Sequence, residues 1–124
     1  MIKTSRGTVA VERAGQRTPA PPGTTVEVGD RVRTGSDGYV GITLRDDTLI
    51  TAGPSSTLLI NDFKFNTTTN TGSMLASFLK GTFGVVTGLL AKQSPDSVQF
   101  KTPTTSLGIR GTEFLVEVLG AKDE

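Results

Sequence analysis

Apolar residues occupy every second position along most of this chain. The alternating positions are Val9 and Val11, Val26 and Val28, Val40, Ile42 and Leu44, Leu58 and Ile60, Val98 and Phe100, Leu107 and Ile109, and Phe114, Val116 and Val118. A period of two sends neighbouring side chains to opposite faces of an extended strand. We therefore predict half-buried strands, with Ile109, Phe114 and Val116 as core positions of the last strands.

Turn-forming residues interrupt this alternation at short intervals. Gly, Pro, Asn and Asp occur at residues 14–16, 19–23, 29–30, 35–38, 46–47, 53–54, 70–72, 94–96 and 102–103. These residue types favour tight turns, and short strands separated by turns about every 8 to 12 residues are typical of sandwiches, barrels and short solenoids. The predicted fold is all-β, with many short strands in either a solenoid-like stack or a β-sandwich.

Two short stretches also allow a helix. Residues 74–80 have apolar side chains at helix-like spacing, and residues 88–93 are long enough for one turn of helix before Pro95. A bent strand, or a strand pair hinged at Gly81, accounts for residues 74–80 equally well, because a glycine inside a strand permits a sharp bend. We favour strands there.

Length and charge narrow the classes of partner. The 124 residues suffice for one domain with its own core. Thirteen Lys and Arg against twelve Asp and Glu give a formal net charge of +1, and the two signs are interspersed. Nucleic acid is not an expected partner, because a phosphate backbone is recognised by clustered basic residues. No apolar run approaches the roughly 18 residues that span a bilayer, so no membrane span is predicted.

Several residue types that commonly carry catalysis are missing. The chain has no histidine and no cysteine, which excludes a serine–histidine triad, a cysteine nucleophile, a disulfide framework and the commonest metal ligands. The glycine-containing segment 81–88 lacks the Gly-Lys-Thr/Ser ending and the dinucleotide spacing of nucleotide-binding loops. We predict no enzyme activity and no cofactor.

Asp46 and Asp47 form the tightest acidic cluster. Adjacent residues point to opposite faces of a strand, and in a turn both side chains are expected to be solvated, so the pair does not suit the two carboxylates of a glycosidase. We interpret residues 45–48 as a hairpin turn in which Asp side chains cap backbone N–H groups. Calcium binding is the alternative, but further ligands at a recognisable spacing are missing, and no metal site is predicted.

The strongest local signal lies in residues 101–118, where two glycines bracket an arginine inside an alternating pattern. Glycines at these positions permit a bulge or a close approach of strands, and Arg110 lies at the expected bend. Its guanidinium either ties down carbonyls or one of the acids Asp30, Asp37 and Glu113, or forms an exposed anchor for a partner. We favour the structural role, because five donors beside a bend suit the bridging of turns. The candidate structural or interaction motif comprises Gly108, Ile109, Arg110, Gly111 and Thr112.

A series of sequence blocks, in order along the chain, resembles one bacterial family. The blocks are residues 7–11 (GTVAV), 29–35 (GDRVRTG), 38–44 (GYVGITL), 45–48 (RDDT), 53–57 (GPSST), 78–83 (FLKGTF) and 102–114, which ends in GIRGTEF. Together they resemble the FecR domain, with Gly-Ile-Arg-Gly-Thr as a fairly specific block. The resemblance implies one domain over residues 1–124, with a core at about residues 7–118 and a short tail at 119–124.

The resemblance implies a periplasmic or extracytoplasmic all-β domain, of the kind found in transmembrane regulators of iron-uptake sigma factors and in other envelope proteins. Such a location implies that an export signal has been removed ahead of residue 1. The expected function is a non-catalytic protein-interaction or signalling module. The anti-sigma region, membrane span and receptor-contacting portion of those regulators are not recognised in this sequence, so direct sigma-factor control is not predicted.

Two alternatives remain open. In a structural role, short-stranded layers would stack or pair through an open edge into an oligomer or an envelope scaffold. A carbohydrate-binding role requires aromatic rings that face solvent. The chain has no Trp, one Tyr and six Phe, which is a poor supply of such rings. A protein partner, with self-association as one form of it, is therefore the favoured class of interaction.

Overall fold

A computed structural model describes residues 1–69, 71–103, 106–108 and 113–118. The elements, in chain order, are β1 (Ile2–Arg6), β2 (Val9–Arg13), β3 (Gln16–Pro19), β4 (Arg31–Thr34), β5 (Tyr39–Thr43), β6 (Leu49–Ala52), β7 (Thr57–Asn66), β8 (Thr71–Val86), the helix α1 (Leu89–Gln93), the 3-10 turn η1 (Pro95–Ser97), β9 (Val98–Lys101), β10 (Ser106–Gly108) and β11 (Glu113–Val118). The structure is 59% strand and 7% helix, so the all-β prediction is confirmed.

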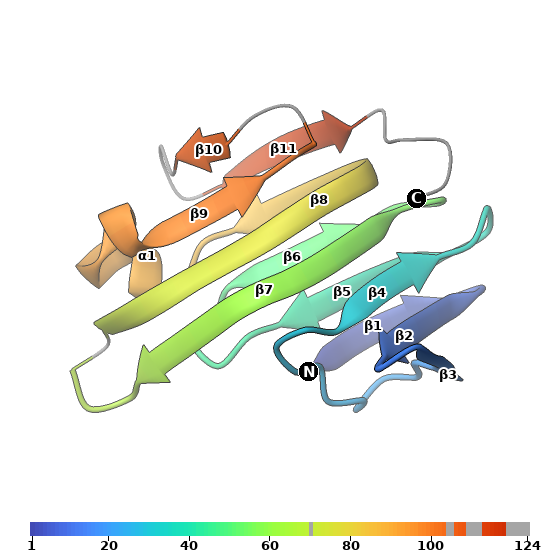
Figure 1. Ribbon diagram of the computed structural model, residues 1–124, viewed down its shortest axis with the longest axis horizontal. Coiled ribbons are helices and arrows are strands. Elements are labelled where there is room, and N and C mark those ends of the chain that lie inside the picture. Colours follow the sequence, from blue (N-terminus) through green and yellow to red (C-terminus); the bar gives the residue numbers. More distant parts are fainter. Residues whose placement is uncertain (70, 104–105, 109–112, 119–124) are drawn as a thin grey trace.

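The strands form a curled half-barrel, with mostly antiparallel pairing, whose two parts share the long strand β8 (Figure 1). One part, which we call sheet A, has the strand order β1-β5-β6-β8-β11; the other, sheet B, has the order β3-β2-β4-β7-β8-β9-β10. Residues 81–86 of β8 pair with β6 and β11, whereas residues 71–80 pair with β7, and β9 lies parallel to β8. The predicted all-β fold thus takes the form of one curled sheet that bends within β8.

The bend in β8 lies at Gly81, where the sequence predicted a hinge. Gly81 has a φ of 108°, a conformation that side-chain-bearing residues rarely adopt. A Cβ atom there would also overlap the side chain of Ser56. Both observations explain why glycine stands at the point where β8 passes from sheet B to sheet A.

Two phenylalanines on either side of this bend build the centre of the core. Phe78 and Phe83 are five positions apart, so a regular strand would send their rings to opposite faces. One extra residue, Leu79, lies outside the register between β7 and β8, and a bulge of this kind re-aims the side chains that follow it. Both rings therefore face the core, where they stack with centroids 4.4 Å apart. Phe100 of β9 stacks on Phe78 at 5.3 Å.

Most of the apolar positions predicted from the alternation are buried. The buried ones are Val9, Val11, Val40, Ile42, Leu44, Leu58, Ile60, Val98, Phe100 and Val118. Phe114 and Val116 are half-buried and pack against this core, whereas Ile109 lies outside the described residues. The expectation of a strand at Val26 and Val28 is wrong: both lie in an irregular segment between β3 and β4, and Val28 is 53% exposed.

The two stretches with helical potential have different structures. Residues 74–80 belong to β8, as favoured from the sequence, and residues 89–93 form the helix α1. This helix belongs to the connection from β8 to the parallel strand β9. Among the described residues, no helix has the length and apolar character needed to cross a membrane.

Candidate functional site

The motif predicted from the sequence, Gly108 to Thr112, is flanked by strands of different sheets. Gly108 ends β10, where it faces Gln99 on β9 in sheet B. Glu113 begins β11, where it faces Val86 on β8 in sheet A. The other members of the motif, which are Ile109, Arg110, Gly111 and Thr112, lie outside the described residues.

Of the three acids considered as partners of Arg110, Asp30 already has a cationic partner. Its carboxylate is 1% exposed and accepts hydrogen bonds from Nε and Nη2 of Arg13, at 2.8 and 2.7 Å. The backbone N–H of Glu27 donates to it as well, at 2.8 Å. Burial alone would raise the pKa of Asp30, but the hydrogen bonds from Arg13 and Glu27 outweigh burial and hold this pKa below its usual value.

Asp46 and Asp47 lie in the hairpin turn between β5 and β6, as interpreted from the sequence, but only Asp47 is solvated. Asp46 is fully buried, which corrects the expectation that both side chains are exposed. Its carboxylate accepts hydrogen bonds from N–H and Oγ1 of Thr48, at 3.1 and 2.8 Å, and from N–H of Leu90, at 3.2 Å. Asp46 thus joins the turn to the first turn of α1, and the expected capping of backbone N–H groups is confirmed.

These carboxylates do not form a metal-binding cluster. Within residues 1–69, 71–103, 106–108 and 113–118, no three or more Asp, Glu, His or Cys side chains are grouped so that they could hold a metal ion. The oxygens of Asp46 are already occupied by three donors on Thr48 and Leu90. The calcium alternative therefore has no support at this turn.

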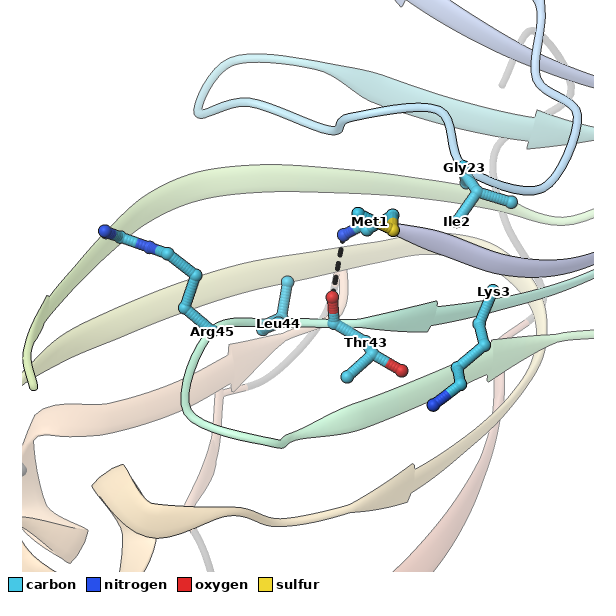
Figure 2. A pocket seen from close by; sticks show the side chains of 7 residues that line it. All are labelled: Met1, Ile2, Lys3, Gly23, Thr43, Leu44 and Arg45. Carbon is cyan, nitrogen blue, oxygen red and sulfur yellow. Dashed lines mark hydrogen bonds between the residues drawn. The ribbon is translucent and has the colours of Figure 1, made fainter.

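A groove with an apolar lining and two basic side chains, Lys3 and Arg45, is the best-formed candidate site. It consists of two hollows that adjoin at Leu44 and Arg45, with volumes of about 430 and 230 Å³. The first is lined by Met1, Ile2, Lys3, Gly23, Thr43, Leu44 and Arg45 (Figure 2). The second is lined by Val26, Glu27, Val28, Leu44, Arg45, Ile60 and Phe63. We call the two together the Arg45 groove.

Contacts around the Arg45 groove hold its polar groups in place. The Met1 amino group donates a hydrogen bond to the carbonyl of Thr43, at 2.7 Å (Figure 2). The guanidinium carbon of Arg45 lies 5.5 Å from the ring centroid of Phe63, close enough for a cation–π contact. Figure 2 shows the side chains of Arg45 and Lys3 extending on opposite sides of Thr43. The groove can therefore hold apolar groups in its hollows and a carboxylate beside Lys3 or Arg45.

Sequence reasoning missed this groove, although its parts carried a signal. Val26 and Val28 were assigned to a strand because they alternate, but the exposed Val28 lines the groove instead. Arg45 was assigned only to the turn before Asp46. An exposed valine and an arginine beside a turn are each ordinary; their juxtaposition depends on the way β1, β5 and β7 meet.

Comparison with known families identifies the chain. Residues 30–124 match the model of a family described as FecR protein, and this match covers more than half of the chain. The chain belongs to the FecR family. No curated protein and no solved structure matches it. FecR domains are regulatory and sensor modules rather than enzymes, and they are typically extracytoplasmic.

The FecR match begins after the first three strands, yet those strands complete the FecR sheets. β1 pairs with β5, and β2 pairs with β4. Asp30, the first matched residue, is bound by Arg13 at the end of β2. The Arg45 groove likewise combines Lys3 of β1 with Arg45 from the matched region. The candidate site therefore spans the boundary between the FecR match and the strands that precede it.

Proposed function

We propose that this FecR domain is a non-catalytic, periplasmic protein-interaction module that takes part in signalling at the bacterial envelope. The observation that supports it best is the Arg45 groove, which combines an apolar lining with the basic side chains of Lys3 and Arg45. The family supports a signalling module in general. The groove adds a surface on which a partner could be recognised.

The groove favours one kind of occupant, a protein segment with an apolar side chain next to a carboxylate. Its exposed apolar side chains, among them Met1 and Val28, offer area that is removed from water on binding. Lys3 and Arg45 supply positive charge at the rim, and Arg45 presents a planar fork suited to a carboxylate. Glu27, the acid in the lining, lies 3.3 Å from Arg13 in an ion pair. The electrostatic character of the groove therefore favours an acidic segment.

Two blocked peptides test this proposal. Acetyl-Glu-Leu-Glu-Ile-Glu-amide should shift the backbone amide signals of Lys3, Thr43 and Arg45 in NMR titrations, and the same peptide with Lys in place of Glu should not. Arg45→Glu should abolish or reverse this preference, whereas Lys101→Glu, an exposed change on β9 outside the groove, should leave it intact. Equal shifts with both peptides, or no shifts in the groove, would contradict the proposal.

The Gly108 to Thr112 motif is proposed to be structural, with Arg110 tying its bend to an acid or to carbonyl groups. Because Arg13 already binds Asp30, Asp37 and Glu113 are the remaining acids of the original three. Arg110→Lys should then lower the free energy of unfolding by about 1–3 kcal/mol, since one ammonium cannot replace a planar fork. An unchanged urea midpoint would instead favour an exposed anchor for a partner.

Self-association as a scaffold is the second candidate function, and β11 is the feature that favours it. Among the described residues, β11 pairs with β8 on one side and with no strand on the other. Leu115 at its centre is 81% exposed. Two copies of β11 paired antiparallel about Leu115 would place Glu113 opposite Glu117, and this repulsion weakens the pair near neutral pH.

Sedimentation measurements separate the scaffold from the interaction module. If the domain self-associates through β11, the double variant Glu113→Gln with Glu117→Gln should form more dimer than the wild type, because the repulsion between the glutamates of the two copies is removed. Leu115→Lys should eliminate that dimer. A monomer in all three proteins would contradict the scaffold role and would leave binding at the Arg45 groove unaffected.

A further inference from the structure

Another hollow lies on the outer face of sheet B, away from the two that form the Arg45 groove. Strand register places Ala10 of β2, Arg33 of β4, Thr57 of β7 and Lys80 of β8 in one row across the sheet. Short side chains at Ala10 and Thr57 therefore alternate with long basic ones at Arg33 and Lys80. The result is a hollow of about 230 Å³, whose lining also includes Thr8, Arg17 and Gly35.

Thr57 is the feature of this hollow that points to a ligand. Its side chain lines the hollow, although the residue is only 1% exposed. Throughout the described part of the chain, no hydrogen bond is found for its hydroxyl group. Buried hydroxyl groups are almost always hydrogen-bonded, because an unsatisfied one costs free energy. The Thr57 hydroxyl can therefore donate to an acceptor that sits in the hollow.

The charges around Thr57 indicate that this acceptor is an anion. Arg17, Arg33 and Lys80 contribute three positive charges, and the neighbouring Glu12 and Asp37 contribute two negative charges, which leaves one positive charge. Glu12 lies 3.3 Å from Arg17 and 3.1 Å from Arg33 and so holds these two side chains side by side. The hydrogen bond from Arg17 and the positive charge of Arg33 keep the pKa of Glu12 below its usual value.

We propose that this hollow is a binding site for a compact ligand with phosphate-type oxyanions. A guanidinium fork, an ammonium group and a hydroxyl donor are the groups that proteins use to bind phosphate oxygens. The volume corresponds to about eight water molecules at about 30 Å³ each, which is more than one phosphate group occupies. The site therefore suits a diphosphate or a phosphorylated small molecule better than a single phosphate.

Titration with three probes tests the site and identifies the source of the oxyanion. Inorganic phosphate, pyrophosphate and phosphatidylglycerol vesicles would each be added to the isotope-labelled chain, with the amide signals of Thr8, Gly35 and Thr57 as readout. Pyrophosphate should shift these signals at lower concentration than phosphate does, and salt should weaken the effect. Shifts caused by vesicles alone would assign the oxyanion to a lipid headgroup. No shift with any probe would overturn the proposal.

Three variants test the assigned contacts. Lys80→Gln should weaken pyrophosphate binding about tenfold, because it removes one charge-assisted hydrogen bond. Thr57→Val, which keeps the shape and removes the hydroxyl, should weaken binding about threefold to tenfold without lowering the melting temperature. Lys101→Gln, an exposed change on β9 outside the hollow, is the matched control for charge. If Lys80→Gln and Lys101→Gln weaken pyrophosphate binding equally, the binding depends only on general surface charge, and the proposed site is overturned.

Discussion

Asp30 and Asp46 are both almost fully buried, but the protein satisfies them in different ways. Asp30 is paired with Arg13, so a cation neutralises its charge directly. Asp46 accepts hydrogen bonds from neutral donors, which are the N–H groups of Thr48 and Leu90 and the Thr48 hydroxyl. Burial of a carboxylate thus has two solutions here, one that depends on charge and one that depends on backbone geometry.

The two carboxylates also differ in what they connect. Arg13 keeps half of its side-chain surface exposed, so water screens its pair with Asp30. Asp46 is fully buried and joins two segments that are 44 residues apart, the β5–β6 turn and the start of α1. We therefore expect stability to depend more on the neutral network around Asp46 than on the ion pair of Asp30.

The largest expected effect is that of Asp46→Asn. The new amide group would face N–H or hydroxyl donors of Thr48 and Leu90 and leave at least one of them unsatisfied. The free energy of unfolding, measured in urea, should fall by about 2–3 kcal/mol. Asp47→Asn is the matched control, because Asp47 is exposed at a φ of 70°, which asparagine tolerates. It should change stability by less than about 0.5 kcal/mol; equal losses would show that Asp46 has no special role.

A smaller loss is expected for Asp30→Asn, because water can partly solvate the released Arg13. The free energy of unfolding should fall by about 1–2 kcal/mol. Asp37→Asn, at an exposed aspartate that accepts one hydrogen bond from Thr8, should have less than half of that effect. A double-mutant cycle with Arg13→Gln would isolate the pair. Strict additivity of the two changes would show that the ion pair contributes nothing to stability.

The smallest expected effect is a difference in pH dependence. The folded-state pKa of Asp30 lies below its ordinary value of 3.8. Between these two pKa values the unfolded chain binds more protons than the native state, so stability rises with pH there and is lost as pH falls through the folded-state pKa. Urea midpoints measured from neutral pH down to about pH 2 should therefore fall less steeply for Asp30→Asn than for the wild type. Parallel curves would contradict this assignment.

Much of the fold followed from local patterns. The alternation of apolar residues predicted strands because a strand has a period of two whatever its neighbours are. Gly81 was recognised as a hinge because a glycine inside an apolar strand usually marks a bend. The FecR-like blocks predicted the family that the comparison confirmed. Each of these inferences depends on a few neighbouring residues or on short motifs.

The candidate sites did not follow from such patterns. In the sequence, Thr57 and Lys80 are ordinary residues of two strands; they become neighbours because of the β7–β8 register, and Arg33 joins them through β4. The Arg45 groove depends similarly on β1 reaching β5 from outside the matched region. Cross-strand register over long sequence distances is set by the packing of the whole core.

The sequence by itself determined the all-β class, the strand periodicity, the hinge and the family, because backbone geometry and short motifs express these locally. Only the tertiary structure decided which polar residues are buried and which basic residues converge. Asp46 illustrates the difference: its adjacency to Asp47 suggested an exposed pair, whereas its burial depends on the N–H of Leu90, which α1 supplies. Burial and convergence are properties of segments packed together, and no single segment contains the donors that make them favourable.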